Sequence, residues 1–150
     1  MAEAAIDKSS DHGPAFFSYG FRPFFLGAAI FSGVAVPAWI LLFVRGVDHT
    51  FLYAPRDWHV HEMLFGFLPA IITGFLLTAI PNWTERAPVR GMPLMVLWTL
   101  WLAGRLVIAV PWFSPVVSAI VDAAFLVVVA AIVCERWPLV EAGALRRWEV

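Results

Sequence analysis

Two long stretches of this sequence contain no charged residue. Phe24 to Val44 and Met63 to Thr84 both run without Asp, Glu, Lys or Arg. One helical crossing of the hydrocarbon core of a bilayer takes about 20 mostly apolar residues. A helix also satisfies its own backbone hydrogen bonds, which a lipid environment demands. Each stretch therefore predicts a transmembrane helix.

Two further apolar runs contain a single charge each. They are Met92 to Val110, with Arg105, and Pro115 to Val133, with Asp122. Apolar residues make up 61% of the 150 residues and charged residues only 14%, a balance outside that of water-soluble domains. We therefore expect an all-α, multi-pass membrane protein with about four transmembrane helices. Its parts would be a disordered polar tail (1–20), a four-span domain (21–135) and a C-terminal end (136–150).

The basic residues indicate how such a bundle would be oriented. Four spans place both termini on one side of the membrane, together with the loop between the second and third spans. That side collects most of the basic side chains, namely Lys8, Arg22, Arg86, Arg90, Arg136, Arg146 and Arg147, whereas Arg45 and Arg56 fall on the other. Because cytoplasmic loops are enriched in Lys and Arg, both termini are predicted to be cytoplasmic.

The two charges within spans are predicted to meet. A short turn, "AVPWFSP", joins the third and fourth spans, and its prolines discourage a continuous helix. Arg105 and Asp122 lie at similar distances on either side of this turn, so antiparallel helices bring them to nearly the same depth. Charges within a membrane usually find a partner. The pair either fixes the helix register or gives Arg105 a direct role in holding an anionic ligand.

The stretch "DWHVHEML" gathers titratable groups at the start of the second span. Asp57 is a plausible N-cap, so that the helix would begin at Trp58. His59, His61 and Glu62 would then lie in the outer half of the bilayer, near the depth of Arg105. Interfacial residues that only meet water are the simplest interpretation, and metal binding or proton transfer by these groups is the alternative.

Spacing limits how these groups can act together. On a helix, His59 shares a face with Glu62 and with Met63, whereas His59 and His61 point to nearly opposite sides. One metal ion could take both imidazoles only if the chain around His59 were extended. Imidazole binds copper, iron and zinc alike, and the thioether of Met63 would favour copper or haem.

Below Glu62 the second span carries a small residue at every fourth position, Gly66, Ala70, Gly74 and Thr78. Such stripes allow close approach between transmembrane helices, so the edge with Glu62 is expected to face another helix. Pro69 cannot donate a backbone hydrogen bond and should bend this helix.

Several blocks of the sequence, taken in order, resemble a known family. "FRPFF" (21–25), "WHVHEMLFG" (58–66), "GFLLTAIPNWT" (74–84) and "WLAGR" (101–105) are similar to the amino-terminal part of the NnrS family. Its members are described as bacterial integral membrane proteins that contain haem and copper and are associated with nitric oxide response and denitrification. The resemblance implies a bacterial inner-membrane protein with haem and copper as cofactors.

The same resemblance carries over the histidine and acid cluster, Asn82 in a "PNWT" loop, and Arg105. It does not say which of these residues binds which cofactor. We predict cofactor binding by His59, His61 and Arg105, metal ligation by His59, His61 and Met63, and orienting or proton-handling roles for Glu62 and Asp122. Family members are several-fold longer than this chain. A complete site is therefore expected to need further membrane helices or a second copy.

Two other functions fit the residues. Glu62, Arg105 and Asp122 would form an ion or proton path in a transporter module, or would only hold helices together in a cofactor-free assembly subunit. The sequence leaves open whether the chain is an enzyme. No serine or cysteine is placed with a base for nucleophilic catalysis. No basic block suggests nucleic acid, so the expected partner is the lipid bilayer.

Overall fold

The structure, a computed structural model, describes residues 14–46, 53–84 and 86–147, with side chains described as far as residue 136. All regular elements of the described part are helices, and it contains no strand. In chain order the elements are η1 (Ala15–Phe17), α1 (Phe21–Val44), α2 (Pro55–His61), η2 (Glu62–Phe67), α3 (Leu68–Thr84), α4 (Met92–Ala109) and α5 (Pro115–Arg147).

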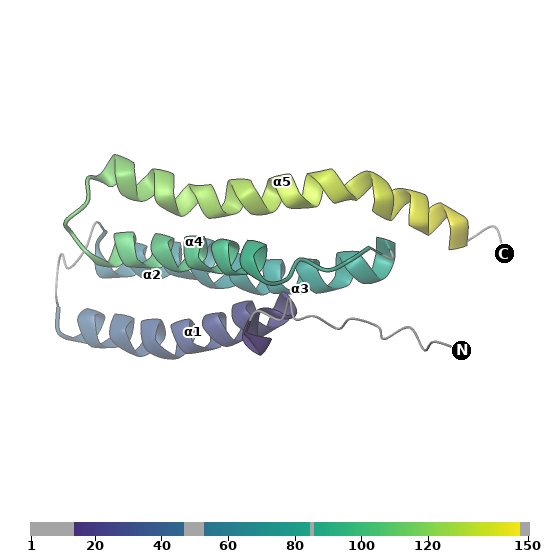
Figure 1. The fold of residues 1–150 in the computed structure, drawn as a ribbon. Helices are drawn as coiled ribbons and strands as arrows, with labels where there is room; N and C mark the ends of the chain where they lie inside the picture. Colours follow the sequence, from purple (N-terminus) through teal and green to yellow (C-terminus); the bar gives the residue numbers. More distant parts are fainter. Residues whose placement is uncertain (1–13, 47–52, 85, 148–150) are drawn as a thin grey trace.

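Four of the helical stretches are long and apolar enough to cross a membrane, as predicted. They are Phe21–Val44, Pro55–Thr84, Met92–Ala109 and Pro115–Arg136, and the second is built from α2, η2 and α3 in succession. In Figure 1 the spans lie side by side and alternate in direction. We call the end with the start of α1 and α4 the termini end, and the end with the start of α2 and α5 the hairpin end.

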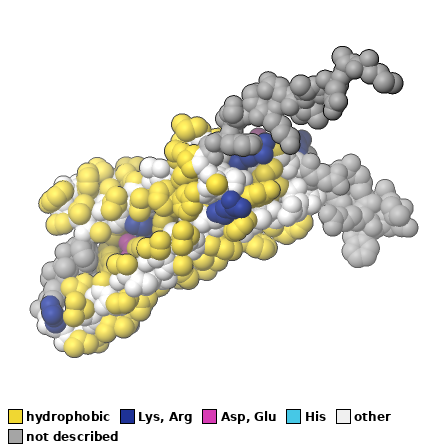
Figure 2. All heavy atoms as spheres, turned by 60° about the horizontal axis from the view of Figure 1, so that its bottom comes forward, with side chains coloured by type: hydrophobic (Ala, Val, Ile, Leu, Met, Phe, Trp, Pro, Cys, Tyr) yellow, Lys and Arg dark blue, Asp and Glu magenta, His cyan; other side chains and the backbone are white. Residues whose placement is uncertain are grey.

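The outer surface of the bundle is apolar, as a bilayer requires. Val34, Met92, Val96 and Val127 are each more than 60% exposed, and apolar side chains cover much of the face in Figure 2. Soluble proteins rarely expose apolar patches of this extent. Together with its four apolar spans, this surface makes the chain a multi-pass membrane protein.

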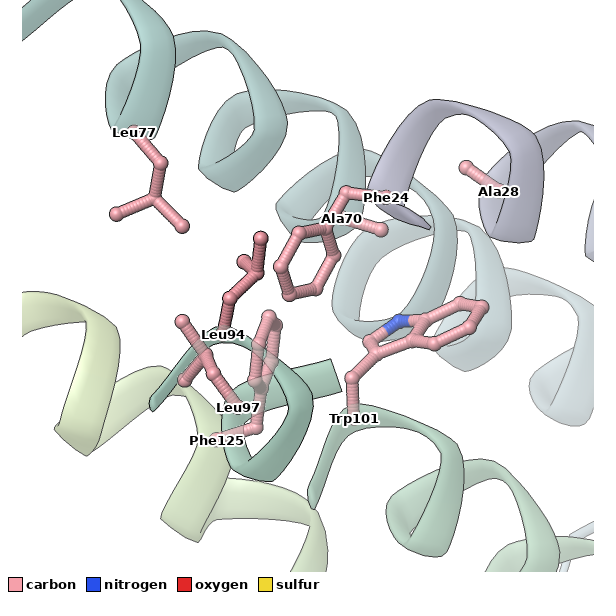
Figure 3. Close-up of a cluster of buried hydrophobic side chains, with 8 residues drawn as sticks. All are labelled: Phe24, Ala28, Ala70, Leu77, Leu94, Leu97, Trp101 and Phe125. Atoms are coloured by element: carbon pink, nitrogen blue, oxygen red, sulfur yellow. The ribbon is translucent and has the colours of Figure 1, made fainter. Parts of the chain in front are cut away.

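A cluster of buried hydrophobic side chains holds the spans together (Figure 3). Phe24 of α1 packs on Phe125 of α5, with ring centroids 5.8 Å apart, and on Trp101 of α4 at 6.5 Å. Rings from three helices thus meet at one level. The whole cluster comprises Phe24, Ala28, Ala70, Leu77, Leu94, Leu97, Trp101 and Phe125.

The second span begins earlier than the sequence indicated. The helix starts at Pro55, after Ala54 in the N-cap position, so the predicted N-cap at Asp57 is wrong. Proline fits the first helical position because its fixed φ suits a helix and its missing N–H would have had no partner there. Asp57 lies in the first turn instead, where a carboxylate still faces the positive end of the helix dipole.

A π-helical segment, η2, interrupts the second span before Pro69. The N–H of Leu68 donates to the carbonyl of Met63, five residues back, instead of four. The indole of Trp101 in α4 donates to the Gly66 carbonyl at 2.9 Å, which supplies a partner from a neighbouring helix. Pro69 was expected to disturb the hydrogen-bond ladder. The structure has a π-helical turn just before Pro69, in place of the regular α-helical hydrogen bonds.

At both ends, helical structure continues past the boundaries predicted for the four-span domain. Of the segment expected to be a polar tail, residues 14–20 are described, and the Phe17 carbonyl accepts a hydrogen bond from the Gly91 N–H at 2.9 Å. Residues 1–13 lie outside the described part. At the other end, α5 continues as one helix to Arg147, past the expected end of the fourth span at Val133.

Candidate functional site: a buried charge cluster beside a separate histidine

Arg105 of α4 lies at the centre of a cluster of charged side chains inside the bundle. Its Nη1 is 2.5 Å from Oε2 of Glu62 in η2, and its Nη2 pairs with Oδ1 of Asp122 in α5. The three side chains are only 5%, 1% and 8% exposed. The predicted pairing of Arg105 with Asp122 is therefore observed, and Glu62 is a second partner from a third span.

The positions of these residues along their helices explain why they meet. Glu62 follows the helix start at Pro55 by seven residues, and Asp122 follows the helix start at Pro115 by seven. At 1.5 Å per residue, both carboxylates lie about 10 Å from the hairpin end. Arg105 lies four residues before Ala109, at about 6 Å, and its long side chain covers the difference.

His61 joins the cluster from the last turn of α2. Its Nε2 is 3.2 Å from Oδ2 of Asp122, and its Nδ1 is 3.7 Å from Oε1 of Glu62. Tyr53 and Phe65 stack on its ring, with centroids 5.1 and 5.0 Å away. We call His61, Glu62, Arg105 and Asp122 the buried charge cluster.

Two glycines leave the space that the cluster occupies. A Cβ atom on Gly66 would collide with Nη1 of Arg105 and lie 2.9 Å from Oε2 of Glu62. A Cβ atom on Gly104 would lie 3.1 Å from Oδ1 of Asp122. Gly66 belongs to the small-residue stripe predicted to face another helix, and its burial beside Arg105 confirms that prediction at this position. A role for Gly104 was not predicted.

His59 lies apart from the buried charge cluster. Its ring stacks on Trp39 of α1, with centroids 4.0 Å apart and planes 14° apart. The same region holds an apolar group of Ala35, Trp58 and Ile108, against which Trp39 and Met63 pack. The Nδ1 atom of His59 is buried and has no hydrogen-bond partner among the described residues. The predicted divergence of His59 and His61 is thus seen in their different neighbours.

Comparison with known proteins identifies the family of this chain. The model of the family described as NnrS protein matches residues 15–150. The chain belongs to the NnrS family. No curated protein and no solved structure gives a significant match to it.

The NnrS resemblance implied ligands for haem and copper, and the residues present fit only part of such a site. Both histidines belong to α2, so the extended arrangement that would bring them to one ion does not occur. Across the described residues, no three His, Cys, Asp or Glu side chains are grouped so that they could hold a metal ion. The donors in this region are the imidazole of His59, which stacks on Trp39, and the thioether of Met63, which packs against the same apolar group as Trp39.

Arg105 and Asn82 are the two other residues of the NnrS motifs whose surroundings the structure describes. The guanidinium of Arg105 already meets two carboxylates, so its charge is matched within the chain. Asn82 of "PNWT" does not lie in a loop, because α3 continues to Thr84. Its side chain is exposed at the termini end and lines a hollow there.

Proposed function

We propose that this NnrS-family chain acts in nitric oxide or nitrosative-stress metabolism and contributes His59 to a haem or copper site near the outer membrane face. Membership of the family supports the metabolic role. The observation that carries the site is the imidazole of His59, whose buried Nδ1 has no partner among the described residues. Buried polar atoms usually have a hydrogen-bond partner, so an unpaired nitrogen indicates a role outside the local packing.

His59 and Met63 would hold the cofactor together. They are four residues apart in one continuous helical span; His59 stacks on Trp39, and Met63 packs against the same apolar group as Trp39. An imidazole nitrogen and a thioether are ligands that copper and haem iron accept. A bound haem or copper ion would supply a redox-active centre that coordinates small molecules. The other ligands would come from further membrane helices or a second copy of the chain.

The buried charge cluster has a positioning role in this proposal. Glu62, Arg105 and Asp122 come from three different spans, so their contacts fix those spans against one another. His61 is tied to Asp122 rather than left open for a metal. The cluster thereby sets the rotation of α2, and with it the direction in which His59 faces.

The orientation of the bundle in the membrane is also part of the proposal, and it rests on the distribution of arginine side chains. Arg22, Arg86, Arg90 and Arg136 lie at the termini end, whereas Arg45 and Arg56 lie near the hairpin end. By the positive-inside rule the termini end is cytoplasmic. His59 and the buried charge cluster then lie in the outer half of the inner membrane of a bacterium.

The test compares the two histidines directly. The full chain and its variants His59→Ala and His61→Ala are purified from membranes in mild detergent, and visible spectra and iron and copper contents are measured. We expect His59→Ala to lose the cofactor and His61→Ala to retain it. A wild-type protein free of haem, iron and copper would refute cofactor binding by this chain. Equal content in all three proteins would refute the role of His59.

A second candidate is an ion- or proton-coupled transporter module. Oε1 of Glu62 and Nε of Arg105 are buried without hydrogen-bond partners among the described residues. The carboxylate oxygen can therefore accept a further hydrogen bond, and the Nε–H can donate one. Ionisable residues within membranes often line ion or proton paths. Glu62→Gln abolishing proton-coupled uptake into liposomes, with cofactor-free protein, would favour this function. Unchanged uptake would exclude it.

A further inference from the structure

A hollow opens at the termini end, on the opposite side of the membrane from His59. It has a volume of about 390 Å³ and lies where the segment before α1 meets the last turns of α3 and the residues after them. Its lining consists of Tyr19, Thr78, Pro81, Asn82, Arg86 and Pro88. None of these side chains takes part in the buried charge cluster or in the surroundings of His59.

Local packing builds one wall of the hollow. A Cβ atom on Gly20 would lie 2.5 Å from Cβ of Leu77, so glycine allows this turn of the chain to rest directly on α3. Arg22 donates to the Ala15 carbonyl at 2.8 Å, and its guanidinium lies 5.7 Å from the centroid of the Tyr19 ring. These contacts hold the phenol of Tyr19 at the edge of the hollow.

The polar groups of the lining are suited to an anion. Arg86 and Asn82 are exposed, and Tyr19 is 47% exposed, so a guanidinium, an amide and a phenol are accessible from the hollow. Among the described residues, the lining includes no carboxylate. No described acidic side chain forms an ion pair with Arg86. Guanidinium groups bind phosphate through paired, charge-assisted hydrogen bonds.

The depth of the hollow matches the boundary between head groups and lipid tails. Thr78 lies six residues before the end of α3 at Thr84, so the hollow extends about 9 Å into the span. Thr78 and Pro81 line the part of the hollow within the span, and Arg86 lies beyond the helix end. Trp83 is 39% exposed in the same last turn, as expected of an interfacial aromatic. In Figure 2, arginine side chains lie towards the upper right, next to apolar surface, and others lie at the left.

We propose that this hollow binds the phosphate of an anionic phospholipid, with Arg86 as the charge partner and Tyr19 and Asn82 as hydrogen-bond donors. Basic pockets between transmembrane helices are a recurring type of lipid site. A free phosphate ion offers the same chemistry to Arg86. The apolar lining at membrane depth favours the lipid, because a soluble ion makes no use of it. This proposal is independent of any cofactor at His59.

The experiment titrates the detergent-purified full chain with dioctanoyl phosphatidylglycerol and counts bound lipids by native mass spectrometry. Parallel titrations use dioctanoyl phosphatidylcholine and inorganic phosphate. Arg86→Gln should weaken binding of phosphatidylglycerol by about tenfold, the loss expected for one charged hydrogen-bonding partner. Tyr19→Phe should weaken it by a smaller factor. Arg90→Gln is the matched control, since it removes the same charge from the same face without altering the lining.

Phosphatidylglycerol binding that depends on Arg86 and not on Arg90 would support the site. Equal losses in the two variants would overturn it, because they would indicate general attraction to a basic surface. Equal binding of phosphatidylcholine would also overturn it. Displacement of phosphatidylglycerol by millimolar phosphate would show that the hollow prefers the free ion, and would overturn the assignment to lipid. Circular dichroism confirms that each variant is folded.

Discussion

Replacing Arg105 by alanine should destabilise the bundle severely. The side chains of Glu62 and Asp122 are 1% and 8% exposed, and each forms an ion pair with this one guanidinium. Without it, two carboxylates remain buried with only the imidazole of His61 nearby. Removing one partner of a buried ion pair typically costs about 3–5 kcal/mol. We expect the free energy of unfolding to fall by that amount.

Asp122→Ala should cost less, because Arg105 keeps its contact with Glu62. Loss of one charged hydrogen bond is worth about 1.5–3 kcal/mol. In the double variant, removal of Asp122 also removes a carboxylate that the loss of Arg105 would have left unpaired. The double variant should therefore lose less stability than the two single variants lose together, with a coupling energy of about 1–3 kcal/mol.

The assay is unfolding by sodium dodecyl sulfate in dodecyl maltoside micelles, followed by circular dichroism and tryptophan fluorescence. Arg45→Ala is the control, since Arg45 is exposed at the hairpin end and its loss should change stability by less than about 0.5 kcal/mol. Additivity of Arg105→Ala and Asp122→Ala within about 0.5 kcal/mol would refute the reasoning. It would mean that the two side chains do not interact in the membrane protein.

Three further predictions concern the groups that shape the cluster. Gly66→Ala should cost about 1–3 kcal/mol, because the added methyl group meets Arg105 and Glu62, whereas Gly33→Ala, with no atom within 4 Å, should be neutral or stabilising; unfolding in the same micelles compares them. Trp101→Phe removes the hydrogen bond to the Gly66 carbonyl and should cost about 1 kcal/mol or more in that assay. His61→Ala should lower stability through the lost contact with Asp122 while iron and copper contents remain those of the wild type.

The four spans were predictable because they depend on local composition. Uncharged runs of membrane length became helices, and the prolines of the turn between α4 and α5 fixed an antiparallel hairpin. Counting residues from that turn was enough to bring Arg105 and Asp122 to similar depth. Helical rise is nearly constant, so depth follows from sequence whenever a turn is located correctly.

Rotation about the helix axes was not predictable in the same way. The spacing of His59 and His61 indicated opposite sides but not which side would face α5. The π turn of η2 adds to the difficulty, because it shifts the faces of the helix on either side of it. It ends just before Pro69, and its Gly66 carbonyl accepts a hydrogen bond from Trp101 of another helix. A motif within one span carries no signal for that distant contact.

The start of the second span shows a different limit. Both Pro55 and Asp57 are residues that favour the beginning of a helix, and the structure uses the proline as the first helical residue. The predicted start at Trp58 and the observed start at Pro55 differ by three residues, an error typical of helix boundaries predicted from sequence. The boundary changes the length of α2 but not the spacing of His59 and Glu62. Even so, His59 stacks on Trp39 of α1 whereas Glu62 pairs with Arg105 of α4, so the predicted shared face does not give the two residues the same neighbours.

The buried charge cluster is better understood as a constraint on register than as a source of stability. Two of its polar atoms, Oε1 of Glu62 and Nε of Arg105, lack hydrogen-bond partners among the described residues, and buried ion pairs often stabilise no more than apolar packing would. Arg105 can meet both carboxylates in only one alignment, because sliding one span by a single helical turn, about 5.4 Å, separates them. His61 and His59 occupy the same turn of α2, so that alignment also determines where His59 lies. A variant that replaces the cluster by apolar residues should therefore keep its helices while losing any cofactor held by His59.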